Sequence, residues 1–123
     1  MAQRLSFFLH RQPHLSREAF QDYWRGTHAQ LVADRAETIG CVRYVQVHTA
    51  LDAAAASPGG PEPFDGIAEL WIDPEVRAAA SETPEGKRAM EERQQDGQQF
   101  IDHSRSVYMV VEETFVFEES PSA

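Results

Sequence analysis

Residues 106–117 form an apolar segment in which both faces of the expected strand are hydrophobic. One face carries Val107, Met109, Val111, Phe115 and Phe117, and the other carries Tyr108, Val110 and Val116. The segment 66–72 has the same property. Its two faces carry Ile67 and Trp71, and Ala68, Leu70 and Ile72. An antiparallel sheet with one solvated face alternates apolar and polar residues instead. The sequence therefore predicts a sheet that is covered on both sides.

The order of the predicted elements indicates what covers one of those sides. An aromatic-rich strand over 4–11 precedes an amphipathic helix over 16–37, which ends before Gly40. Strands over 41–48 and 66–72 follow, then a helical turn and a polar helix over 74–101, and the last strand. This β-α-β-β-α-β order is the ferredoxin-like α+β arrangement, with both helices on one face. We expect the second face to pack on a second copy of the chain, which predicts a homodimer.

Length and loop composition favour one domain. A chain of 123 residues lies within the usual size of a domain, and we place the core at residues 4–118. The segment 49–63 is rich in Ala, Ser, Gly and Pro and has no periodicity, so we interpret it as a flexible loop.

Charge, cysteine content and hydropathy exclude several classes of protein. The net charge of −9 argues against nucleic-acid binding, which requires clustered Lys and Arg. No apolar run reaches the ~18 residues of a membrane span. A lone cysteine, Cys41, favours a reducing compartment, so we expect a cytoplasmic protein. The chain has no Cys-x-x-Cys, phosphate loop or dinucleotide fingerprint, so we expect no metal and no cofactor.

Four segments, in order, carry a family resemblance. The segment 16–29, SREAFQDYWRGTHA, resembles the opening helix of EthD-type proteins, and the segments 43–48, 64–71 and 100–102 resemble later landmarks. The resemblance implies a dimeric α+β barrel with a pocket between sheet and helices, usually without a cofactor. Relatives include decarboxylases and dehydratases that tailor aromatic polyketides. The wider superfamily adds cofactor-free monooxygenases, muconolactone-type isomerases and heme-using enzymes.

His28 is the first candidate for a catalytic residue. It lies four residues after Trp24 on one helical face, so it should point toward the sheet. Gly26, which is costly inside a helix, suggests that something approaches the backbone there. The alternative is a buried core histidine bonded to a carbonyl. A pocket histidine suits proton transfer, because an ordinary pKa near ~6.5 keeps both protonation forms accessible.

A second group of candidates lies on the strands. Tyr44, Gln46 and His48 share one strand face, so they contact either a ligand or a dimer partner, and His48 is a second catalytic candidate. Tyr23, Trp24 and Trp71 line a pocket or belong to the core. Glu69 is either a buried acid in the site or the structural partner of an Arg.

Three functions remain open. The favoured one is a cofactor-independent enzyme that acts on an aromatic or polyketide-like small molecule by lyase, cyclase or isomerase chemistry, with His28 as acid or base. The second is a heme-binding or cofactor-free monooxygenase barrel. The third is a non-catalytic accessory protein that binds a small ligand.

Overall fold

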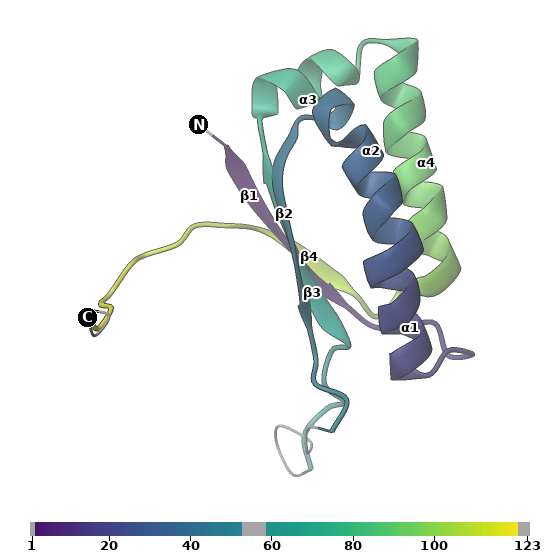
Figure 1. The fold of residues 1–123 in the computed structure, drawn as a ribbon, viewed down its shortest axis with the longest axis vertical. Coiled ribbons are helices and arrows are strands. Elements are labelled where there is room, and N and C mark those ends of the chain that lie inside the picture. Colours follow the sequence, from purple (N-terminus) through teal and green to yellow (C-terminus); the bar gives the residue numbers. More distant parts are fainter. Residues whose placement is uncertain (1, 53–58, 121–123) are drawn as a thin grey trace.

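The computed structural model describes residues 2–52 and 59–120. Its elements are β1 (Gln3–Leu9), α1 (Arg17–Tyr23), η1 (Trp24–His28), α2 (Ala29–Ile39), β2 (Cys41–His48), β3 (Gly66–Ile72), α3 (Pro74–Ala80), α4 (Pro84–Phe100) and β4 (Val107–Val111). The strands form one antiparallel sheet in the order β2-β3-β1-β4. All helices lie on one face of this sheet, and the other face is open (Figure 1). The predicted ferredoxin-like α+β fold is confirmed.

The N-terminal helix is one continuous rod with a π-helical turn inside it. Ser16 caps α1 by accepting a hydrogen bond from the Ala19 N–H at 3.1 Å, and Gly40, at φ 77°, ends α2. We expected an uninterrupted α-helix over 16–37. Instead η1 adds a wider turn, a feature that often marks functional sites. Trp24 and His28, at its two ends, are both turned to the sheet and only 1% and 7% exposed.

Strand register assigns each side chain to one face. Leu5 and Phe7 of β1 face the helices together with Tyr44 of β2 and Leu70 of β3. The open face is formed by the alternate positions. Its members are Arg4, Ser6, Phe8, Arg43, Val45, Val47, Ile67, Glu69, Trp71, Val107, Met109 and Val111. Val107, the first residue of β4, also contributes to the cavity between sheet and helices. The predicted division of β3 between two faces is confirmed.

The last strand is shorter than expected. β4 ends at Val111, which pairs with Arg4 near the start of its partner β1. The prediction that the strand reaches residue 117 is therefore wrong. Residues 112–120 leave the sheet on its open side (Figure 1), and Phe115, Val116 and Phe117 are 70–83% exposed.

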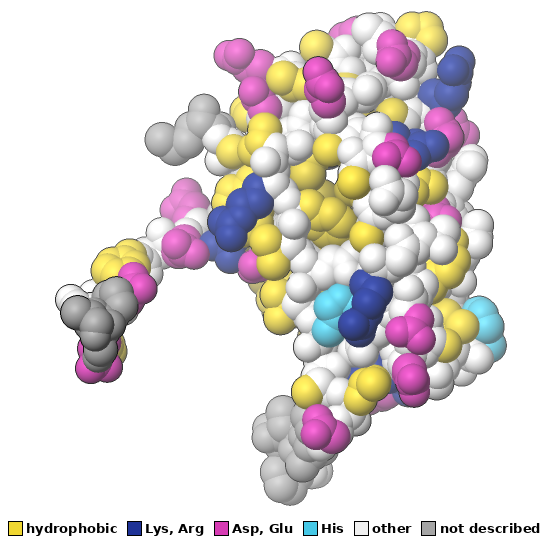
Figure 2. Space-filling view, in the orientation of Figure 1, with side chains coloured by type: hydrophobic (Ala, Val, Ile, Leu, Met, Phe, Trp, Pro, Cys, Tyr) yellow, Lys and Arg dark blue, Asp and Glu magenta, His cyan; other side chains and the backbone are white. Residues whose placement is uncertain are grey.

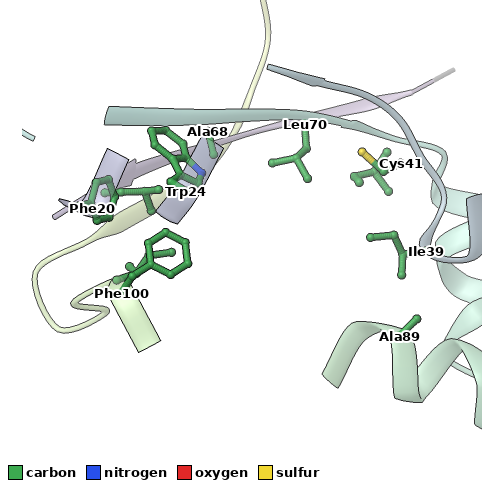
Figure 3. Close-up of a cluster of buried hydrophobic side chains, with 11 residues drawn as sticks. Phe20, Trp24, Ile39, Cys41, Ala68, Leu70, Ala89 and Phe100 are labelled. Carbon is green, nitrogen blue, oxygen red and sulfur yellow. The ribbon is translucent and has the colours of Figure 1, made fainter. Parts of the chain in front are cut away.

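The core fills the space between helices and sheet in two groups. Phe20, Trp24 and Phe100 meet at one end, where the Phe20 ring lies 5.5 Å from Trp24 and 5.3 Å from Phe100. Ile39, Cys41 and Ala89 lie at the other end (Figure 3). No helix in the described part of the chain is long and apolar enough to cross a membrane. Of the predicted flexible loop, residues 53–58 lie outside the described residues.

Candidate active site

A cavity of about 470 Å³ lies between the sheet and the helices. Hydrophobic side chains are visible at the bottom of a hollow between the sheet side and the helix side (Figure 2). The lining comes from strands β1 to β4, from η1, α2, α3 and α4, and from the loop that follows α4. Its residues are Leu5, Phe7, Leu9, Trp24, His28, Val32, Tyr44, Ala68, Leu70, Arg77, Arg93, Gln94, Gly97, Ile101, His103, Ser106, Val107, Tyr108 and Val110. The cavity is thus mainly apolar and has a few polar groups at fixed positions, as ligand pockets do.

The inner face of α4 explains why there is space for a cavity. This face carries Ala89, Arg93, Asp96 and Gly97 before it reaches Phe100. Small residues leave volume unfilled, and the two charged residues are placed where a helix of this kind usually has Leu or Ile. The sequence predicted only a polar helix here, and neither Arg93 nor Asp96 was identified as a site residue. Their spacing of three and four residues around Ala89 and Phe100 was the available signal.

His28 is held by a carboxylate on α4. Its Nδ1 lies 2.7 Å from Asp96 Oδ2, and the Tyr23 hydroxyl donates a hydrogen bond of 2.6 Å to Asp96 Oδ1. Asp96 and His28 are both buried, while Tyr23 is half-buried at the outer edge of the group. The sequence candidates Tyr23 and His28 are therefore brought together, and the residue that joins them is Asp96.

The protonation states in this group follow from burial and hydrogen bonding. Burial lowers the pKa of His28 below its ordinary value of 6.5, although the Asp96 carboxylate opposes that shift. The hydrogen bond to Asp96 raises the pKa of Tyr23 to about 12. At neutral pH His28 is thus a neutral imidazole. When Nδ1–H is donated to Asp96, the free lone pair of the ring lies on Nε2. His28 Nε2 is not one of the buried polar atoms that lack a hydrogen-bond partner.

A chain of hydrogen bonds joins the strand candidates to the same helix. The Tyr44 hydroxyl accepts hydrogen bonds from Trp24 Nε1 at 3.0 Å and from Gln46 Nε2 at 2.9 Å. Gln46 Nε2 also donates to the Trp24 carbonyl at 2.9 Å, and its Oε1 lies 2.9 Å from His48 Nε2. Tyr44, Gln46 and His48 therefore share the helix-facing side of β2, as their spacing predicted, rather than the open face.

Only part of this chain reaches the cavity. Trp24 and Tyr44 line it, whereas Gln46 and His48 do not. His48 packs on the far side of the Trp24 ring, with ring centroids 4.5 Å apart. Burial lowers the pKa of His48 as well. His48 and His28 are therefore separated by Trp24 rather than placed around one substrate.

Glu69 and Trp71 lie on the opposite side of the sheet. Glu69 Oε1 accepts a hydrogen bond of 2.6 Å from Arg4, and Arg43 lies over the Trp71 ring at 4.3 Å. The expectation that these two side chains share a pocket with His28 is wrong, because odd-numbered residues of β3 face away from the helices. The open alternative for Glu69, a structural Arg partner, is the one observed.

Nothing approaches the backbone closely at Gly26, although its destabilising effect in a helix had suggested such a contact. It is exposed, and a Cβ added there would meet no atom within 4 Å. The close approach occurs at Gly66 instead, where a Cβ would clash with the Trp24 ring and lie 2.7 Å from the Val47 carbonyl oxygen. Within residues 2–52 and 59–120, no cluster of three metal-ligating side chains is found.

Comparisons with known proteins identify the family and the fold of the chain. The EthD domain family matches residues 12–104. No curated protein matches the chain. A crystal structure of an ethyl tert-butyl ether d (EthD) family protein from Bacillus halodurans is 25% identical, with a TM-score of 0.59 over 93% of this chain and 100% of that one. The solution structure of a hypothetical Arabidopsis thaliana protein has 13% identity and a TM-score of 0.56 over 95% and 92%, which shows a shared fold. The chain therefore belongs to the EthD domain family.

Proposed function

We propose that this protein is a cofactor-independent enzyme in which His28 transfers protons to and from an aromatic or polyketide-like small molecule. The observation that carries the proposal is the 2.7 Å contact between His28 Nδ1 and Asp96 Oδ2 at the wall of a mainly apolar cavity. A base that is oriented by a buried carboxylate is a recurring arrangement in acid–base catalysis.

Each member of the group has a distinct part in the proposed reaction. His28 Nε2 takes a proton from an acidic C–H or O–H of the substrate. Asp96 holds the ring in the tautomer that leaves Nε2 free and stabilises the imidazolium that forms. Tyr23 fixes Asp96 by donating to its other oxygen. The imidazolium then returns the proton to a leaving hydroxyl or to a carbanion, as in dehydration, decarboxylation or isomerisation.

We further propose that the protein acts as a homodimer that buries the open face. This face carries apolar side chains such as Val47, Val107 and Met109, each 43–49% exposed. The adjacent segment 112–120 adds three exposed aromatic or aliphatic residues. A self-complementary two-fold interface would cover all of these in one step.

The test of the catalytic proposal is the His28→Gln variant, with His14→Gln, at an exposed position, as its matched control. Gln keeps much of the size of His but does not titrate. We expect turnover of an identified substrate to fall by at least ~10²-fold in His28→Gln, with ligand affinity and thermal midpoint little changed. Near-normal turnover in His28→Gln would contradict the proposal.

Heme binding is a second candidate, favoured by the same contact. A metal-ligating histidine usually donates its other ring N–H to a carboxylate or carbonyl, which leaves Nε2 for the iron. This candidate predicts a Soret band in the purified protein or after hemin is added, and loss of that band in His28→Gln. A protein that stays colourless and does not bind hemin is not a heme protein.

A further inference from the structure

Two arginines in the cavity wall lack the carboxylate partners that most other arginines of the chain have. Arg4, Arg11, Arg17, Arg35 and Arg105 each contact a Glu or Asp within 4.0 Å. Arg77 of α3 and Arg93 of α4 line the cavity and form no such pair with any described residue. An unpaired positive charge beside an apolar surface lowers stability, so the presence of these two arginines calls for an explanation.

The hydrogen-bonding capacity of these arginines is largely unused. Arg77 Nε donates to the Ile39 carbonyl at 2.9 Å, which anchors the side chain but engages neither terminal nitrogen. Arg93 donates no hydrogen bond to a described residue, and its Nε is fully buried. Burial lowers the pKa of Arg93, and the nearby charge of Arg77 lowers it further. Both arginines line the same cavity, Arg77 from α3 and Arg93 from α4.

A third donor points to the same ligand chemistry. The Tyr44 hydroxyl already accepts two hydrogen bonds, from Trp24 and Gln46, which use both of its lone pairs. Burial raises the pKa of Tyr44, so its own proton stays in place and is free to be donated. The cavity therefore offers two guanidinium forks and one hydroxyl proton, and all three are donors.

We propose that the cavity takes a planar aromatic or conjugated carboxylic acid, whose carboxylate is held by Arg93 and Arg77 while its ring system lies on the apolar wall formed by the sheet. The guanidinium fork matches a planar carboxylate in a bidentate way, which favours this group over a neutral one. The inference names the substrate class for the function proposed above and rests on it for any catalytic meaning.

The position of the arginines relative to His28 gives the carboxylate a second effect. The charge of Arg93 is one cause of the lowered pKa of His28. A bound carboxylate neutralises that charge, so it raises the pKa of His28 and strengthens the base when substrate is present. The ligand would thus be oriented with its acidic position toward His28 and its carboxylate along α4.

The experiment compares two ligands of nearly equal shape, 2-naphthoate and its neutral analogue 2-naphthamide, by titration calorimetry. We expect the wild type to bind the acid about 10–100-fold more tightly than the amide, the range for hydrogen bonds to a charged group. Arg93→Gln should abolish this preference and Arg93→Lys should retain part of it. Arg88→Gln, at an exposed position of the same helix, should change nothing.

Stability separates a binding role from a structural one. Removal of an unpaired charge from a cavity wall should leave the thermal midpoint of Arg93→Gln unchanged or raise it. The proposal is overturned if the wild type binds acid and amide equally, if it binds no naphthoate at millimolar concentration, or if Arg93→Gln keeps the preference. His28→Gln should retain the preference for the acid, so a failure of the catalytic proposal would be seen independently.

Discussion

Replacement of Asp96 by Asn separates the charge of the buried carboxylate from its shape. Asp96 accepts hydrogen bonds from the Tyr23 hydroxyl at 2.6 Å and from His28 Nδ1 at 2.7 Å, and its side chain is about 10% exposed. Asn has almost the same size, and its oxygen can accept from one neighbour, but its NH2 group donates and bonds to His28 only if the ring proton moves from Nδ1 to Nε2. Asp96→Asn therefore removes the negative charge and leaves the packing intact.

The structure gives the direction and size of the expected changes. The bond to Asp96 raises the pKa of Tyr23 to about 12, so in Asp96→Asn it should return toward its ordinary 10.0, roughly a hundredfold change in acidity. The pKa of His28, already lowered by burial, should fall further because the opposing effect of Asp96 is lost. Exchange of charge-assisted for neutral hydrogen bonds should cost about 1–2 kcal/mol of unfolding free energy.

Two titrations measure these changes without any knowledge of the substrate. Ultraviolet absorbance follows the phenol groups, with Tyr23→Phe used to assign the transition of Tyr23. Proton NMR follows the His28 ring. If Asp96→Asn leaves the titrations of both Tyr23 and His28 unchanged, or raises the pKa of His28, the carboxylate does not hold the two groups as described. The account of the site would then be wrong.

Three further predictions concern stability and assembly. Gly66→Ala should lose about 1–3 kcal/mol in urea unfolding, because its Cβ clashes with Trp24, whereas Gly26→Ala should gain up to ~1 kcal/mol; equal effects would contradict this. Burial lowers the pKa of three histidines (His10, His28 and His48), so the unfolded chain binds protons first and stability should fall as pH drops below 6.5; an unchanged thermal midpoint between neutral pH and about pH 5 would refute it. Light scattering should give twice the chain mass of 13.9 kDa at micromolar concentration, and a monomer would exclude the proposed dimer.

The fold could be predicted from the sequence because its determinants are local. Short apolar segments mark the strands, Ser16 and Gly40 mark the ends of the first helix, and the order of the elements selects the topology. The extent of the last strand could not be predicted in the same way. Residues 112–117 look like strand, but a strand needs a partner, and the pairing with β1 ends at Val111, opposite Arg4 near the start of β1.

The site was predictable from the sequence only for residues that lie on one face of a single helix or strand. The helical spacing of Trp24 and His28 correctly indicated which side they face, and the period of β2 placed Tyr44, Gln46 and His48 together. The partner of His28 lies 68 residues away on α4, and no pattern within either helix reveals that pairing.

Glu69 shows a second limit of the sequence, which is the assignment of a strand residue to one face of the sheet. Its period was recognised, but the sequence does not state which face of a sheet the helices cover. That choice is made by the tertiary structure, which turns Glu69 toward Arg4 and away from the cavity. Gly26 was misplaced for a similar reason, since a glycine in a helix indicates a cost without saying which side of the helix bears it.

The pH dependence of kcat/KM tests the central claim, that neutral His28 is the base, most directly. This parameter reports the ionisation of groups in the free enzyme. We predict that kcat/KM rises with pH and reaches a plateau near neutrality, with a midpoint below 6.5 that coincides with the pKa of His28 measured by NMR. A profile that stays flat through the titration of His28, or that falls as His28 loses its proton, would contradict the account.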